Sequence, residues 1–312
     1  MKICENRMVD LFPQERHIQP LTPLFDFADP FKVAVSMALG EAHRTQWAPQ
    51  AANVPCKPGP SDCALEAEAL EIVLVRHAQP EWEPGGRAVD DPGLTPLGQA
   101  QAQCAAEALA DERFDQIFYS PLKRTVETAQ PILERLGQSG QTISWLREMT
   151  LASLEGQTSE QVRDYFSAVH ARALPQWWEG LPGGESFRHF YERVSGGLEG
   201  LLARDHRVAI QEENAHRLWQ IPDPDARILI IAHEGTNAAL ISHLLGIEPV
   251  PWVNLRFSGS WAGISSLHSM EITGGALFAL AYFDRVDHLR SLQHQGAGSG
   301  RSAAPRPTAG MD

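Results

Sequence analysis

Two short apolar segments that each end at a histidine constrain the fold of this 312-residue chain most strongly. The segment Glu71–Val75 is followed by Arg76 and His77, and the segment Arg227–Ala232 is followed by His233. Short runs rich in β-branched residues are typical of buried strands. Because ligands of open α/β sheets bind beyond the carboxyl ends of the strands, parallel pairing would bring both histidines to one ligand-binding edge.

Helix start signals separate the expected strands. Thr95, followed by proline, predicts an N-cap and a helix to about residue 110, and Ser120 repeats this signal before a helix that ends near residue 136. Further strands are expected over 114–119 and 142–145, further helices over 158–178, 185–203 and 236–245, and a terminal hairpin over 263–272 and 276–283. This alternation predicts a three-layer α/β/α sandwich with a mainly parallel central sheet.

Composition narrows the classes of partner. The net charge of -13 argues against a nucleic-acid surface, and no apolar run approaches the length of a membrane helix. The first residues lack the basic and apolar pattern of a signal peptide, and nothing in the spacing of the four cysteines requires an oxidising compartment. We therefore expect a cytoplasmic protein with no membrane or nucleic-acid partner. No cluster of histidine and acidic residues has metal-site spacing, so no metal and no cofactor is expected.

Several blocks of the sequence occur in a recognisable order. They are 72–82, 94–98, 119–125, 146–149, 183–187 and 230–235. Together they resemble the histidine phosphatase superfamily, whose fold is phosphoglycerate mutase-like. The resemblance covers residues 71 to 283, and any one block alone would be a weak signal. It implies a histidine phosphatase domain over 71–289.

The resemblance implies a role for each charged residue of these blocks. His77 would be the nucleophile that becomes phosphorylated, and Arg76 and Arg124 would hold the phosphoryl oxygens with paired hydrogen bonds. His233 would be the second histidine of the phosphate pocket. Glu148 would be the general acid that protonates the leaving oxygen and then activates water, which requires a raised pKa.

Some positions depart from the family pattern. Alanine stands at 78 and at 152, where glycine is usual, and Glu234 replaces the usual glycine after the second histidine. A carboxylate beside a phosphate site would repel the substrate, point outward, or bind a cationic part of the substrate. Because the block around Glu148 is imperfect, Glu155 is retained as an alternative acid.

The implied activity is metal-independent hydrolysis of a phosphomonoester through a phosphohistidine. The partner is then a small phosphorylated metabolite, with Arg87 and Glu185 as weaker candidates for contacts to its remainder. Glu83 stands where the mutase subgroup has asparagine, which disfavours the first alternative, a phosphoglycerate mutase-type phosphotransferase. The second alternative is a non-catalytic member that binds phosphate or protein, although such a module would not need an acid.

The remaining segments carry less information. Residues 1–70 are rich in proline and predict a partly extended or disordered N-terminal extension, with one short helix over 31–39. Residues 290–312 are rich in glycine and predict a disordered tail. Residues 204–226 form a longer connection than the family usually has, and we expect a tolerated surface insertion. A homodimer is left open.

Overall fold

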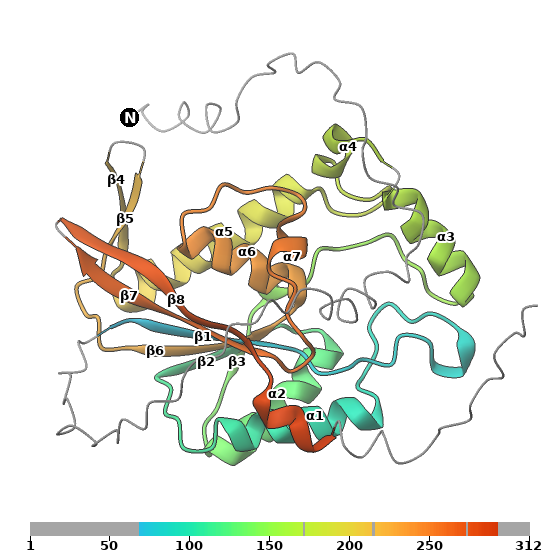
Figure 1. Cartoon of the computed structure of the whole chain (residues 1–312), viewed down its shortest axis with the longest axis horizontal. Helices are drawn as coiled ribbons and strands as arrows, with labels where there is room; N and C mark the ends of the chain where they lie inside the picture. The colour runs from blue at the N-terminus through green and yellow to red at the C-terminus, as the bar shows by residue number, and fades with distance from the viewer. Residues whose placement is uncertain (1–68, 171, 214–215, 273, 293–312) are drawn as a thin grey trace, which may run out of the picture. The chain divides into compact units, whose positions relative to one another are not determined.

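The computed structural model describes residues 69–170, 172–213, 216–272 and 274–292. The expectations for the N-terminal extension up to residue 68 and for the tail from residue 293 lie outside the described residues. Within the described part, eight strands form one sheet in the order β3-β2-β6-β1-β7-β8-β5-β4. Helices cover both faces of this sheet, as Figure 1 shows. The predicted α/β sandwich is therefore confirmed.

The sheet has a parallel and an antiparallel half. In chain order the strands are β1 (Glu71–Arg76), β2 (Gln116–Tyr119), β3 (Gln141–Thr142), β4 (Ala209–Glu213), β5 (His216–Gln220), β6 (Arg227–Ala232), β7 (Ile264–Ile272) and β8 (Gly275–Arg285). Neighbouring strands are parallel from β3 to β1 and antiparallel from β1 through β7, β8 and β5 to β4. The expectation of a mainly parallel sheet thus holds for one half only, because two hairpins widen the sheet on the other side.

The described helices are α1 (Pro96–Ala108), α2 (Lys123–Leu136), α3 (Ser159–His170), α4 (Leu174–Trp178), α5 (Phe187–His206), α6 (Glu234–Leu244) and α7 (Val253–Arg256). Four of them, α1, α2, α5 and α6, lie close to the places expected from the sequence, and α7 was not expected. The helical region expected over 158–178 consists of two helices, α3 and α4. Pro175 stands in the first turn of α4, where its missing N–H is tolerated, whereas it would interrupt a continuous helix.

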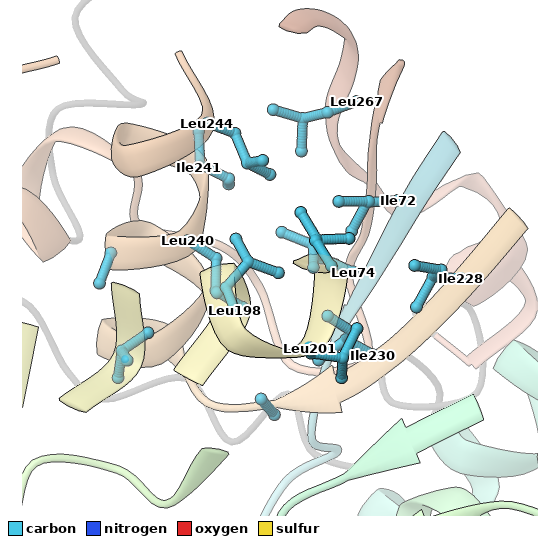
Figure 2. Packing of buried hydrophobic residues seen from close by; sticks show 14 of the residues in the cluster. Ile72, Leu74, Leu198, Leu201, Ile228, Ile230, Leu240, Ile241, Leu244 and Leu267 are labelled. Carbon is cyan, nitrogen blue, oxygen red and sulfur yellow. The ribbon is translucent and has the colours of Figure 1, made fainter. Parts of the chain in front are cut away.

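Successive side chains of β1 point to opposite faces of the sheet and enter different cores. Ile72 and Leu74 pack with α5 and α6, and this core is shown in Figure 2. Val73 and Val75 pack with α1 and α2 on the opposite face. Because β1 is buried on both faces, its sequence is a continuous apolar run rather than an alternating one.

Two helix starts behave differently from each other. The Thr95 hydroxyl accepts a hydrogen bond of 2.9 Å from the Gly98 amide at the start of α1, as predicted. A Cβ on Gly98 would lie 2.1 Å from the Gln79 carbonyl oxygen, so this helix end approaches the loop after β1 too closely for a side chain. The second helix begins at Lys123, and Ser120 does not cap it. The cap expected at Ser120 was wrong.

The long connection over 204–226 contains a hairpin that the sequence did not reveal. Strands β4 and β5 pair antiparallel there and extend the sheet beyond β8. Trp219 of β5 is 1% exposed and packs its ring against Phe278 of β8, with ring centroids 5.3 Å apart. The insertion is therefore part of the core rather than a surface loop. None of the described helices is long and apolar enough to cross a membrane.

Candidate active site

Two histidines meet at the carboxyl edge of the parallel strands. His77 follows β1, His233 follows β6, and the pairing of these two strands is parallel. The His77 amide donates a 2.9 Å hydrogen bond to the Ala232 carbonyl, which fixes the two strand ends side by side. The two imidazole rings lie with centroids 5.2 Å apart, and both side chains are buried. The two histidines therefore meet at one edge of the sheet, as the sequence predicted.

The environment of His77 defines its protonation state. Its Nδ1 lies 2.8 Å from the Ala78 carbonyl oxygen, which can only accept a hydrogen bond, so Nδ1 carries the proton. Burial, together with the charge of Arg124, lowers the pKa of His77 to about 3. His77 is consequently neutral at physiological pH, and its Nε2 keeps the lone pair that a nucleophile needs.

His233 is fully buried and is held by a hydroxyl. Its Nε2 lies 2.8 Å from Ser120 Oγ, whereas its Nδ1 has no hydrogen-bond partner among the described residues. Burial and the neighbouring His77 lower the pKa of His233 well below the usual value. Ser120 was interpreted from the sequence as a helix cap. Its true partner is 113 positions away, and no local signal would have identified it.

Arg124 is a buried cation with unused donors. It lies in the first turn of α2 and is 4% exposed, and its Nε has no hydrogen-bond partner within the described part of the chain. Its Nη1 is 3.6 Å from an Asp91 carboxylate oxygen, and its guanidinium carbon is 4.9 Å from the centre of the Trp82 ring. Lys123, next to it, pairs at 3.9 Å with Glu127 on the helix surface.

Arg76 is more fully engaged than Arg124. Its Nη2 lies 2.7 Å from a Glu234 carboxylate oxygen, and its Nη1 donates to the Gly259 carbonyl. The other Glu234 oxygen accepts a 2.6 Å hydrogen bond from the Ser258 hydroxyl. The carboxylate that replaces the family's glycine therefore points toward Arg76 and offsets its charge. The Nε of Arg76 has no hydrogen-bond partner among the described residues.

Glu148 lies where the chain leaves a short 3-10 helix, Ser144–Leu146. One oxygen of its carboxylate accepts a 2.9 Å hydrogen bond from the Gly235 amide at the start of α6, and the other accepts a 3.0 Å bond from Met149. A Cβ on Gly235 would lie 2.6 Å from Glu148 Oε1, so glycine is needed for this approach. Burial raises the pKa of Glu148 against the opposing effect of these bonds and of the nearby arginines.

The weaker candidates lie outside this group. Glu155 is exposed and accepts a 2.9 Å hydrogen bond from the Asp90 amide. Arg87 is exposed and donates to the Gly156 carbonyl at 3.0 Å. Both carboxylate oxygens of Glu185 pair with the Arg193 guanidinium, at 2.9 and 2.7 Å. These three side chains therefore bind other parts of the protein, and Glu185 in particular is committed to an internal ion pair.

The hydrogen-bond donors of this site suit an oxyanion. They are nitrogen donors from arginine and histidine, and several of them are buried without a partner in the described chain. Among the described residues, no three histidine, cysteine, aspartate or glutamate side chains are grouped so that they could hold a metal ion. Buried donors without partners cost free energy, which an anion with several acceptor oxygens would recover.

Comparison with known proteins identifies the family. The model of the histidine phosphatase superfamily (branch 1) matches residues 72–277, which include all the site residues above and the sheet up to the first residues of β8. The chain belongs to the histidine phosphatase superfamily. The resemblance of the sequence blocks to this superfamily is thereby confirmed, and so is the phosphoglycerate mutase-like fold.

Several members of the superfamily that resemble this chain carry the names of phosphatases. A 2,3-bisphosphoglycerate-dependent phosphoglycerate mutase of Bartonella quintana is also similar, at 35% identity over 131 residues, which are 39% of this chain and 64% of that protein. Phosphoserine phosphatase 1 of Hydrogenobacter thermophilus is 31% identical over 183 residues, which are 57% of this chain and 78% of that protein. Glucosyl-3-phosphoglycerate phosphatase of Mycobacterium tuberculosis is 30% identical over 219 residues, 65% of this chain and 92% of that one. The solved native structure of a mycobacterial glucosyl-3-phosphoglycerate phosphatase is 26% identical, has a TM-score of 0.54, and is matched over 70% of this chain and 100% of its own.

Proposed function

We propose that this histidine phosphatase hydrolyses the phosphomonoester of a small metabolite through a phosphohistidine on His77. The observation that carries the proposal is the neutral, buried His77, whose Nε2 keeps its lone pair beside the cations Arg124 and Arg76. The resemblance to enzymes named as phosphatases of small phosphorylated compounds supports the same class of substrate.

In the first step, the phosphoryl group binds between the two arginines. The planar guanidinium of Arg124 offers its unpaired Nε–H, and Arg76 adds its own Nε–H. Nε2 of His77 attacks phosphorus, the bond from phosphorus to the ester oxygen breaks, and Glu148 gives its proton to that oxygen. The leaving alcohol departs neutral, and the phosphoryl group is held on His77.

In the second step, the same carboxylate acts as a base. Glu148, now ionised, takes a proton from water as the water oxygen attacks phosphorus and the bond to His77 breaks. Inorganic phosphate leaves, His77 recovers its lone pair, and Glu148 is again protonated. Burial raises the pKa of Glu148, which favours the protonated form that the first step needs. His233 donates to the phosphoryl oxygens as they gain charge.

Phosphate release from p-nitrophenyl phosphate and a panel of phosphorylated metabolites, with a chelator present, tests the proposal. We expect release by the wild type that resists the chelator and that is lost in His77→Ala. Release by His77→Ala at the wild-type rate would contradict the proposal. Binding of vanadate without release from any ester would point to the non-catalytic alternative, and interconversion of 2- and 3-phosphoglycerate would point to the mutase alternative.

A further inference from the structure

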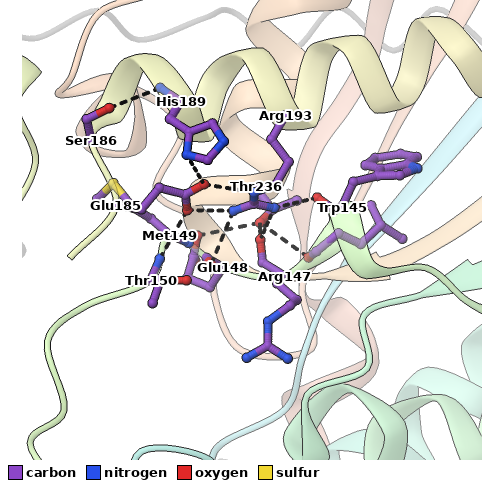
Figure 3. Close-up of polar contacts among 11 residues, drawn as sticks. Trp145, Arg147, Glu148, Met149, Thr150, Glu185, Ser186, His189, Arg193 and Thr236 are labelled. Atoms are coloured by element: carbon purple, nitrogen blue, oxygen red, sulfur yellow. Dashed lines mark hydrogen bonds and ion pairs between the residues drawn. The ribbon is translucent and has the colours of Figure 1, made fainter.

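The loop that carries Glu148 is held in place by Arg193, an arginine of the later helix α5. Arg193 lies on α5, whereas Glu148 lies in the loop after the 3-10 helix, about 45 positions earlier in the chain. Figure 3 shows the Arg193 guanidinium inserted between α5 and this loop. Its Nη1 donates to the backbone carbonyls of Trp145 at 2.7 Å and Arg147 at 3.1 Å, and its Nη2 reaches the carbonyl of Glu148 at 3.5 Å.

The remaining donors of Arg193 are fixed by a carboxylate. Its Nε and Nη2 form two parallel bonds to the oxygens of Glu185, at 2.9 and 2.7 Å. Each of the five N–H donors of the guanidinium thus has an acceptor. Glu185 also binds the loop directly, because its carboxylate accepts from the Thr150 amide at 3.2 Å and its own amide donates to the Thr150 carbonyl at 2.7 Å. The Glu185 side chain is only 8% exposed, so this ion pair is well screened from water.

We propose that Arg193, oriented by Glu185, is the positioning residue for the general acid. Arg193 fixes the backbone up to the Glu148 carbonyl and Glu185 fixes Thr150 beyond it, while the start of α6 fixes the Glu148 carboxylate. Thr236 of α6 reinforces the arrangement, because its hydroxyl donates to the Arg147 carbonyl at 3.2 Å. The inference rests on the proposed function, since it gives Glu148 the role of acid. It also explains why the block around residues 183–187 contains an acidic residue that does not reach the phosphate pocket.

The chemistry of arginine makes the proposal specific. A lysine at 193 would keep the charge, but its ammonium has three donors and no planar fork, so it would satisfy the carboxylate or the carbonyls and not both. Displacement of the acid slows only those reactions whose leaving group needs a proton. p-Nitrophenolate leaves readily without one, whereas phenolate, whose conjugate acid has a pKa of about 10, gains much more from protonation.

The experiment compares kcat/KM for phenyl phosphate and p-nitrophenyl phosphate in Arg193→Lys, Glu185→Gln and Glu148→Gln. We expect Arg193→Lys to lose about 10²-fold on phenyl phosphate and less than about tenfold on p-nitrophenyl phosphate, with the dissociation constant of vanadate within about twofold of wild type. Glu185→Gln should show the same selectivity with a smaller loss. Arg204→Lys is the matched control, because Arg204 lies near the other end of α5 and pairs with Asp205 at the surface.

The outcomes separate the two proposals. If kcat/KM of Glu148→Gln falls equally for both esters, or for neither, the assignment of the acid in the proposed function fails. If Glu148→Gln loses more activity on phenyl phosphate than on p-nitrophenyl phosphate but Arg193→Lys and Glu185→Gln do not, the acid assignment stands and the positioning role is overturned. An equal loss on both esters with weaker vanadate binding in the Arg193 and Glu185 variants would mean a general structural role and would also overturn it. Should Arg193→Lys fail to fold, the selectivity of Glu185→Gln decides.

Discussion

The parallel and antiparallel halves of the sheet are both buried, yet only one of them carries the candidate site. In the parallel half, β1, β2 and β6 all end at the same edge, and the chain leaves each of them into a loop or a helix start. His77, Arg124 and His233 lie in those connections. In the antiparallel half, neighbouring strands end at opposite edges, so no comparable set of chain ends can gather.

The antiparallel half contributes packing instead. His243 of α6, whose ring contacts Trp219 of β5, is paired with Glu199 at 2.9 Å and with the Tyr191 hydroxyl at 3.1 Å. In the pocket, His233 keeps an Nδ1 without a partner in the described chain. Both ring nitrogens of His243 are therefore paired within the protein, whereas His233, Arg76 and Arg124 keep buried donors that a ligand could use.

The largest expected effect is a loss of stability without a loss of activity, in a variant of the antiparallel half. Trp219→Ala removes a buried ring that packs on Phe278 in the antiparallel half, and we expect the free energy of unfolding to fall by about 3–5 kcal/mol. Below the melting transition, kcat should stay within about twofold of wild type. Chemical denaturation and steady-state kinetics on one preparation measure both. A large loss of kcat in the folded variant would break the division between the two halves.

The next effect falls on the active site with little change in stability. Gly235→Ala places a methyl group 2.6 Å from Glu148 Oε1, and we expect kcat/KM for phenyl phosphate to fall about 10²-fold, equivalent to about 2.7 kcal/mol of transition-state stabilisation. Gly196→Ala is the matched control, since nothing lies within 4 Å of a Cβ built there. Equal activity of the two variants would show that Glu148 does not need its bond to the start of α6.

A pH effect follows from the lowered pKa of His77. Between pH 6.5 and about 3 the unfolded chain binds a proton at this histidine that the folded chain does not bind, so stability falls as the pH falls through that range. At pH 5 the loss attributable to His77 is about 2 kcal/mol relative to pH 8. Chemical denaturation of the wild type and of His77→Gln at pH 5 and pH 8 checks this. Between these pH values the free energy of unfolding of the variant should fall by about 2 kcal/mol less than that of the wild type. An identical loss in both proteins would contradict the buried, neutral imidazole.

The smallest effect concerns the charge of the pocket. Glu234→Gln removes the carboxylate that pairs with Arg76, and we expect inorganic phosphate to bind about three- to tenfold more tightly, or about 1 kcal/mol. Glu212→Gln makes the same charge change on β4 of the antiparallel half and should leave the dissociation constant unchanged. Inhibition by phosphate measures both. Weaker binding in Glu234→Gln would mean that Glu234 orients Arg76 rather than offsetting its charge.

Much of the parallel half was predictable from the sequence because its signals are local. The apolar run of β1, the cap at Thr95 and the order of the family blocks each depend on a few neighbouring residues. The terminal hairpin of β7 and β8 was also predicted. The hairpin of β4 and β5 was not, because its strands are rich in polar residues and have no turn signal strong enough to identify them.

Within the site, the residues that the sequence missed act over long distances. Ser120 contacts His233, and Arg193 contacts the Glu148 loop, in each case across many positions and between different elements. The sequence showed that Glu234 departs from the family pattern, but it did not show that the side chain points toward Arg76 and pairs with it. Sequence reasoning found the charged groups, and the structure supplied the contacts that orient them.

Trapping the phosphorylated enzyme tests the central claim most directly. Wild-type protein mixed with labelled p-nitrophenyl phosphate and quenched with base within milliseconds should carry acid-labile phosphate, and peptide mapping should place it on His77. The His77→Ala variant, run beside it, should carry none. Phosphate on another residue, or turnover by the wild type with no covalent intermediate under any quench time, would contradict the account.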